Sequence, residues 1–229
     1  MYVNSQFARC MADALAAQEV YIVRKIIFAT GNMGKLREVK QIMEGLPYEI
    51  ISMKDAGLET EVDETGTSFE ENSLLKAKAI AEKAKETEEY KDALVLADDS
   101  GFEVDYLNGE PGIYSARYMG TDTPYSIKNQ SIIERMQGVP ELKRSARFVA
   151  AIACVFPDGK CEVVRDTFEG RVAYEAKGIY GFGYDPIMYV PEKGCNSGEL
   201  LPEEKNKISH RGKALMKIRE LLINAGYTE

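Results

Sequence analysis

ALVLADDSGFEVDYLNGEPGIYSARY, residues 93–118, is the stretch that decides the fold. Its first five residues are apolar and predict a strand buried on both faces of a sheet. Asp98 and Asp99 follow, and side chains of neighbouring strand residues point to opposite faces. We therefore expect one carboxylate to face a cleft and the other to be held by local packing. A strand that simply ends in an Asx turn is the alternative, but the glycines, proline, tyrosines and arginine at 109–118 favour a functional site.

The size and charge of the chain limit what it can bind. Its 229 residues are enough for one domain, which we expect to form two lobes around a cleft. The 29 basic and 37 acidic residues give a net charge of −8, which argues against a general nucleic-acid-binding protein because phosphates need a basic surface. The longest apolar run, residues 148–156, is too short to span a bilayer. We expect neither a nucleic-acid nor a membrane partner.

Residues 1–24 precede the first predicted strand and form an N-terminal extension of unknown role. Residues 5–19 suit a small amphipathic helix, or the extension is a translated leader. It has no cationic start ahead of a long apolar stretch, so it does not look like a secretory signal. The four cysteines show neither a CxxC pair nor zinc spacing, and we expect reduced thiols in a cytoplasmic protein.

The first loop after a strand is a candidate phosphate site. Residues 25–29 predict a strand, and a helix follows that ends near Glu44. The loop between them, residues 30–35 (TGNMGK), offers a hydroxyl, an amide and an ammonium beside a helix N-terminus, where backbone N–H groups can meet phosphate. Without Walker A spacing, a plain strand–helix turn fits the loop equally well.

An acidic loop is a candidate source of metal ligands. Residues 48–53 predict a second strand, and the loop at 54–66 has an acidic tip that includes Asp63 and Glu64. Mg²⁺ sites are often built from one or two carboxylates together with substrate phosphates. A helix then begins at residue 67 or 68 with a capping-box pattern and runs to residue 84. Lys76 belongs on its solvent face unless it leans into a cleft.

The second half of the chain predicts a helix from Pro124, a hairpin over 147–168 and a glycine-rich cluster at 178–186. The cluster offers aromatic faces that suit a nucleobase, although a glycine-rich turn with core aromatics explains it about as well. The last helix begins near His210, behind the N-cap Ser209, in the most basic stretch of an acidic protein. Cations at a helix N-terminus suit an anion. Together the elements predict an α/β fold with a mixed twisted sheet and flanking helices.

These groups lack a convincing protein nucleophile, since neither a Ser-His-Asp nor a Cys-His set can be assembled. The remaining candidate groups are carboxylates for a divalent cation, donors for phosphate and an aromatic–glycine pocket. They describe a Mg²⁺-dependent enzyme that hydrolyses a nucleoside polyphosphate.

Five motifs, TGNMGK, ETGTSFEENSLLKA, ADDSGFEVDYLNGEPGIYSARY, GFGYDP and SHRGKA, resemble in this order the inosine triphosphate pyrophosphatase family. The resemblance covers about residues 25–225 and implies that residues 25–229 form a nucleoside triphosphate pyrophosphatase domain. It implies hydrolysis of non-standard purine nucleoside triphosphates (ITP, dITP, XTP) to the monophosphate and pyrophosphate. It also implies two lobes around a cleft, a Mg²⁺ cofactor and a cytoplasmic homodimer.

The resemblance also implies roles for single residues. Asp99 is the implied proton acceptor and a metal ligand, and Asp63 is the implied second metal carboxylate, with Glu64 open as the alternative. Phosphate contacts are implied for Thr30, Gly31, Asn32, Met33, Gly34, Lys35 and Ser100. Base and sugar contacts are implied for Phe182, Gly183, Tyr184 and Asp185, and further substrate contacts for Lys205, His210 and Arg211.

The physics of base selection agrees with this resemblance. Hypoxanthine and xanthine carry a 6-oxo acceptor where adenine carries an amino donor, so a site lined with donors selects the oxo group. Three alternatives stay open: a related enzyme for another modified nucleotide, an enzyme that releases orthophosphate, and a nucleotide-binding module without turnover.

Overall fold

The computed structural model describes residues 24–227, and it forms an α/β fold around one seven-stranded sheet. The strand order is β2-β1-β3-β4-β5-β6-β7, parallel across β2, β1 and β3 and antiparallel beyond. The strands are β1 (Arg24–Phe28), β2 (Tyr48–Ser52), β3 (Leu94–Val104), β4 (Ser145–Val155), β5 (Cys161–Val172), β6 (Met188–Val190) and β7 (Cys195–Asn196). The helices of more than one turn are α2 (Met33–Ile42), α3 (Phe69–Lys85), α4 (Tyr125–Arg135), α5 (Pro202–Ile208) and α6 (His210–Asn224). The mixed sheet with flanking helices is confirmed, whereas the helix suggested for residues 5–19 lies outside the described residues.

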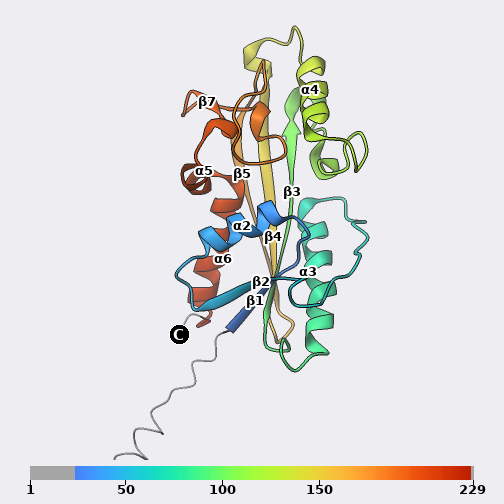
Figure 1. The fold of residues 1–229 in the computed structure, drawn as a ribbon, viewed down its shortest axis with the longest axis vertical. Coiled ribbons are helices and arrows are strands. Elements are labelled where there is room, and N and C mark those ends of the chain that lie inside the picture. The colour runs from blue at the N-terminus through green and yellow to red at the C-terminus, as the bar shows by residue number, and fades with distance from the viewer. Residues whose placement is uncertain (1–23, 228–229) are drawn as a thin grey trace, which may run out of the picture.

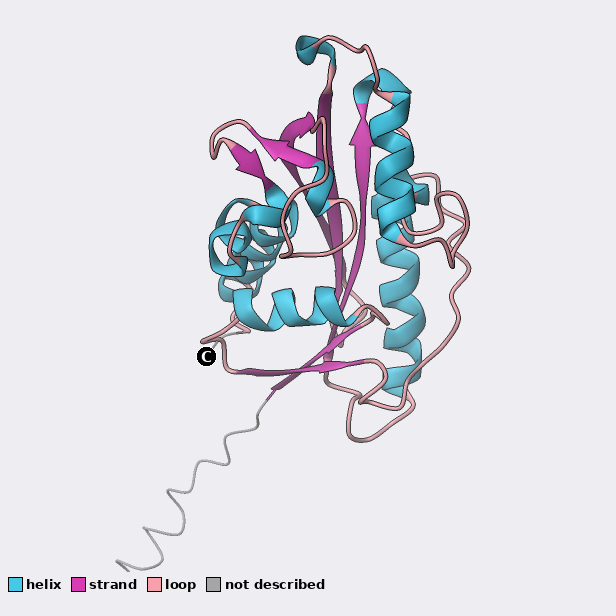
Figure 2. Cartoon of the chain, turned by 45° about the horizontal axis from the view of Figure 1, so that its top comes forward, coloured by secondary structure: helices cyan, strands magenta, loops and turns pink. Residues whose placement is uncertain are grey.

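The molecule divides into two lobes along the long strands. Figure 1 shows β3, β4 and β5 running along the long axis, with α3 beside their lower part and α4 beside their upper part. Figure 2 shows helices on both sides of the sheet. In the upper lobe, Ile132 of α4 and Met136, which follows the helix, are buried in one core cluster with Phe102 of β3. Within the described residues we find no helix with the length and apolar content that crossing a bilayer requires.

The two faces of β3 bury different helices in the lower lobe. Leu94 and Leu96 pack in the core that α2 and α6 share, whereas Val95 and Ala97 pack against α3. This alternation is the period of two that a strand imposes. The same alternation continues through the next two residues of β3, so Asp98 faces α2 and α6 and Asp99 faces α3.

The strand itself is longer than the apolar run predicts. β3 continues through the two aspartates to Val104, paired with β4 from Val95↔Val155 to Val104↔Ala146. The alternative of a strand ending in an Asx turn is therefore wrong. The reason is β4, which is apolar along almost its whole length and offers a continuous buried partner.

The short strand β1 leaves part of β3 open. β1 pairs with β3 only from Ile26↔Leu94 to Phe28↔Leu96, and the chain then turns into the loop ahead of α2. Beyond Leu96, the edge of β3 that faces β1 has no strand partner. Ligands of open parallel sheets bind where the carboxyl end of a strand leaves such a crevice.

Candidate functional site

A cavity of about 300 Å³ lies at this open edge, between the two lobes. Thirteen of the predicted site residues line it: Thr30, Gly31, Asn32, Lys35, Asp99, Ser100, Phe182, Gly183, Tyr184, Asp185, Lys205, His210 and Arg211. Met33, Gly34 and Asp63 do not. The cavity therefore brings together segments that are up to 181 residues apart among these residues, from Thr30 to Arg211.

The loop after β1 uses its own side chains to begin α2. Asn32 is the N-cap, and its Oδ1 accepts from the backbone N–H groups of Gly34 (2.8 Å) and Lys35 (3.2 Å). Thr30 Oγ1 accepts from the Asn32 N–H. Met33 is 62% exposed, in the first turn of the helix. These caps shape the loop and leave the Lys35 ammonium and the positive helix end facing the cavity.

The open edge of β3 is covered by lysines instead of by a strand. The Asp98 carbonyl accepts from Lys76 Nζ at 3.1 Å and from Lys35 Nζ at 3.4 Å. Lys76 comes from α3 and Lys35 from α2, so the two ammonium groups approach from opposite faces of the sheet. The result is a pair of ammonium groups beside the carboxyl end of β1, and such groups can donate to the oxygens of a polyphosphate.

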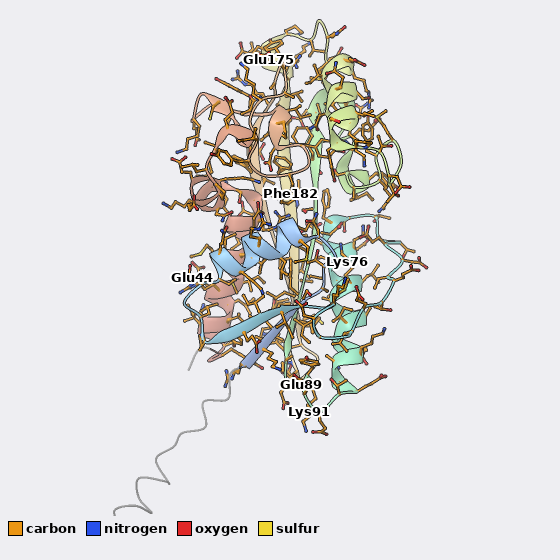
Figure 3. All side chains as sticks on the ribbon, in the orientation of Figure 1. Glu44, Lys76, Glu89, Lys91, Glu175 and Phe182 are labelled. Atoms are coloured by element: carbon orange, nitrogen blue, oxygen red, sulfur yellow. The ribbon has the colours of Figure 1, made fainter. Side chains whose placement is uncertain are left out.

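Lys76 also holds two carboxylates together. Its Nζ lies 2.8 Å from Asp99 Oδ1 and 3.1 Å from Glu64 Oε1, and Glu64 Oε2 accepts from Arg117 Nη1 at 2.7 Å. Burial opposes the charged form of Lys76, but Asp99 and Glu64 outweigh it and hold the pKa of this amine above its ordinary value. Figure 3 labels Lys76 on α3, where it points toward the sheet.

The pKa values of Asp99 and Glu64 are shifted in opposite directions. Burial raises the pKa of Asp99, which is 7% exposed, and Lys76 only partly opposes that rise. Burial also acts on Glu64, but Lys76 and Arg117 outweigh it and hold the pKa of this carboxyl below its ordinary value. A carboxylate with a raised pKa is the better proton acceptor.

The donor set at this point fits a hard divalent cation. Asp99 Oδ2 is buried and has no hydrogen-bond partner among the described residues, so it is free to accept a bound cation. Glu64 lines the cavity, whereas Asp63 is exposed and lies outside it. Within residues 24–227 no three acidic, His or Cys side chains gather as a complete metal site. Glu64 and Asp99 would thus be completed by substrate oxygens, as is usual for Mg²⁺.

On the other face of β3, Asp98 anchors a buried ionic network. Its carboxylate accepts from Arg211 Nε at 2.8 Å and from Lys35 Nζ at 2.6 Å. Arg211 also donates to Glu38 and, at 3.0 Å, to Ser100 Oγ. Burial alone would raise the pKa of Asp98, but Arg211 and Lys35 hold it well below its ordinary value. The carboxylate is held charged by cations from α2 and α6.

Lys205 extends the network to the glycine-rich cluster. Its Nζ lies 2.7 Å from Asp185 Oδ2 and 3.2 Å from Glu38 Oε1, and all three side chains are nearly buried. Asp185 also accepts from Ser197 Oγ and from the Phe182 N–H. Both oxygens of Asp185 are thereby engaged, and this carboxylate shapes the turn that presents Phe182.

Phe182 supplies a flat apolar face at the cavity. Its ring lies 5.3 Å from Lys205 Nζ and 5.6 Å from the guanidinium carbon of Arg211. A Cβ on Gly34 would come within 2.9 Å of the ring, so the ring packs directly on the start of α2. Figure 3 shows Phe182 above α2, where the two lobes meet. Tyr184 is buried, its ring stacks on Phe102, and its hydroxyl donates to the Ser115 carbonyl at 2.8 Å.

His210 is buried at the start of α6 and faces the same cavity. Its ring stacks on Phe148 with centroids 4.9 Å apart, and Nδ1 has no hydrogen-bond partner among the described residues. Burial, with Arg211 and Lys205 nearby, holds the pKa of His210 well below its ordinary value. The imidazole is therefore neutral at neutral pH and offers one donor and one acceptor.

The sequence alone misses Glu38 and gives Lys76 only as an alternative to a solvent-facing lysine. Lys76 follows buried Asn72 by four residues and precedes buried Ile80 by four, so it falls on the inner stripe of α3. A lysine among the inward-facing positions of this helix is the sequence feature that could have identified Lys76 as a site residue. Glu38 has no comparable signal, because its partners lie 167 and 173 residues away.

The comparisons with known proteins agree with the five motifs. The sequence model of the Ham1 family matches residues 26–221. A dITP/XTP pyrophosphatase of Caldanaerobacter subterraneus subsp. tengcongensis is 42% identical over 200 residues, which are 87% of this chain and 96% of that protein. The dITP/XTP pyrophosphatase of Bacillus subtilis is 41% identical over 201 residues, 88% of this chain and 98% of that protein.

A solved structure supports the fold. The Staphylococcus aureus Ham1 protein superposes with a TM-score of 0.76 at 36% identity, covering 88% of this chain and all of that one. The resemblance that the motifs indicated is confirmed.

Proposed function

This chain belongs to the Ham1 family, and we propose that it hydrolyses ITP, dITP and XTP to the nucleoside monophosphate and pyrophosphate. The observation that carries the proposal is the cavity itself. Buried cations, two carboxylates that share one lysine as ion-pair partner, and an aromatic ring all line this cavity. Each of these features serves one part of such a substrate.

The phosphate chain would lie along the open edge of β3. Lys35 and the N-terminus of α2 supply positive charge from one side, and Lys76 supplies it from the other. Charge-assisted hydrogen bonds from such groups are about twice as strong as neutral ones. Thr30, Gly31 and Asn32 bring backbone groups of the same loop to the cavity.

The base would stack on Phe182 and meet donors along its edge. Lys205 uses two of its three donors on Glu38 and Asp185, which leaves one for a ligand. Arg211 keeps one Nη1 hydrogen free after its bonds to Asp98, Glu38 and Ser100. The oxygens of Asp185 are already engaged. A 6-oxo group can accept from these two cations, whereas the amino group of adenine would find no acceptor on Lys205 or Arg211.

Glu64 and Asp99 would hold a Mg²⁺ ion, which when bound shields the charge of the phosphoanhydride. We assign the second carboxylate to Glu64 instead of Asp63, because Glu64 lines the cavity and shares Lys76 with Asp99. Asp99, with its raised pKa, would take the proton of the attacking water. Lys76 would keep the two carboxylates close before substrate arrives.

The experiment is a steady-state assay of the wild-type protein and Asp99→Asn on ITP with and without Mg²⁺, with pyrophosphate and orthophosphate measured separately. We expect pyrophosphate from the wild type only with the metal, and a kcat about 10²- to 10⁴-fold lower in the variant. Tight ITP binding without turnover would support the binding-module alternative, and orthophosphate would support a different hydrolase.

A homodimer, implied by the five motifs, is part of the same proposal. Sedimentation of the full chain at micromolar concentration should give twice the mass of one chain, and a monomer would contradict it. The expected cytoplasmic location stays a prediction that cell fractionation would test.

A further inference from the structure

The loop that carries Glu64 is fastened to α3 by a buried asparagine. Asn72 has no exposed surface, and its Oδ1 accepts from the Gly66 N–H at 2.8 Å. We propose that Asn72 is a positioning residue, which sets Glu64 at the distance from Asp99 that a shared divalent cation requires. This inference rests on the function proposed above.

The contact between the loop and the helix is unusually close. A Cβ added to Gly66 would lie 2.6 Å from Asn72 Oδ1 and 2.7 Å from Glu71 Cβ, so only glycine fits there. The backbone two residues after Glu64 therefore rests directly on α3. A shift of either partner would move Glu64, because Gly66 packs against the backbone of α3 as well as against its side chains and is two residues from Glu64.

The spacing along α3 couples this contact to the catalytic carboxylates. Asn72 and Lys76 are four residues apart, so they lie one above the other on the same face of the helix. Asn72 holds the loop backbone, and Lys76 holds the carboxylate of Glu64 and that of Asp99. The helix thus holds the loop next to Glu64 through these two side chains and sets the distance between the carboxylates.

Fold stability alone does not account for an amide at this place. Asn72 Nδ2 is buried and has no hydrogen-bond partner among the described residues. A buried donor without a partner opposes folding, which offsets what the bond to Gly66 contributes. The amide is better explained by the position that it gives the loop.

A second buried asparagine provides a matched control. Asn129 of α4 is 4% exposed, its Nδ2 donates to the Gly183 carbonyl at 3.1 Å, and its Oδ1 has no partner among the described residues. It fastens a glycine of the base-binding cluster in the same way that Asn72 fastens Gly66. The two substitutions to alanine remove equal volumes and one hydrogen bond each, at opposite ends of the site.

The experiment compares Asn72→Ala and Asn129→Ala in the full chain. The first readout is amide hydrogen exchange of the metal-free protein. Asn72→Ala should speed exchange at residues 64–67 about tenfold, the effect of losing one hydrogen bond, while Asn129→Ala should do so at residues 182–185.

The second readout is the Mg²⁺ concentration that gives half-maximal pyrophosphate release from ITP. Partners that orient metal ligands change metal affinity by about 10- to 100-fold, so Asn72→Ala should raise this concentration by about tenfold or more. At saturating Mg²⁺ its kcat should return close to that of the wild type. Asn129→Ala should raise the KM for ITP and leave the Mg²⁺ requirement unchanged.

An unchanged Mg²⁺ requirement in a folded Asn72→Ala protein would overturn the inference, as would faster exchange spread evenly over the lower lobe. If Asn72→Ala does not fold, Gly66→Ala disturbs the same contact from the loop side and should give the same rise in Mg²⁺ requirement. A wild-type protein that releases no pyrophosphate would refute the proposed function, while the exchange pattern at residues 64–67 would still decide whether Asn72 holds the loop.

Discussion

Replacing Asp98 with asparagine should destabilise the protein in a way that depends on pH. The side chain of Asp98 is fully buried, 2.8 Å from Arg211 Nε and 2.6 Å from Lys35 Nζ. The substitution removes the charge at nearly constant shape and leaves two buried cations facing an amide. Removing one partner of a buried ion pair costs about 3–5 kcal/mol, and we expect about 3 kcal/mol because Arg211 keeps Glu38.

The pH dependence follows from the pKa of Asp98, which is held well below its ordinary value in the folded protein. A carboxyl whose pKa is depressed by folding stabilises the protein fully above its unfolded pKa, near 3.9, and progressively less as the pH falls toward the folded pKa. The difference in free energy of unfolding between wild type and Asp98→Asn should be constant near neutrality and about 1.3 kcal/mol smaller at about pH 3.

The assay is denaturant unfolding of both proteins at each pH, with Glu82→Gln as control. Glu82 pairs with Lys85 at 3.0 Å on the surface, so its substitution should change the free energy of unfolding by less than about 0.5 kcal/mol. A loss below 1 kcal/mol for Asp98→Asn, or a loss that stays the same into the acid range, would refute the assignment of Asp98 as a charged anchor.

Three further predictions concern the cavity. Glu64→Gln should raise the Mg²⁺ requirement of ITP hydrolysis by about tenfold or more, while Asp63→Asn should leave it unchanged. If Asp63→Asn raises the requirement and Glu64→Gln does not, Asp63 is the metal ligand. Lys76→Met removes a cation that opposes the raised pKa of Asp99, so the pH below which kcat/KM falls should move upward. If that pH does not change, Lys76 does not influence the ionisation of Asp99. Phe182→Leu should raise the KM for ITP about tenfold through lost stacking, and an unchanged KM would place the base elsewhere.

The sequence predicts the elements that local patterns control. Ser68 and Ser209 cap α3 and α6 as their spacing indicates, and the hairpin of β4 and β5 forms where Asp-Gly predicts a turn. These features depend on residues a few positions apart, where capping and turn geometry decide. The five motifs likewise bring most of the candidate site residues to one cavity.

Features that depend on distant partners could not be predicted in the same way. The length of β3 is set by pairing with β4, about fifty residues later, and not by its own apolar run. Glu38 is buried because Lys205 and Arg211 neutralise it, which no local pattern reveals. The choice of Glu64 over Asp63 depends on which side chain the loop turns inward, and the loop is fixed by its contact with α3.

In the proposed function, one cavity selects a 6-oxopurine triphosphate with its cations and cleaves it with its carboxylates. The most direct measurement is kcat/KM for pyrophosphate release from ITP, dITP, XTP and ATP at saturating Mg²⁺. We predict values for the first three that exceed that for ATP by at least about a hundredfold. Equal values for ITP and ATP would show that the cavity does not select the 6-oxo group.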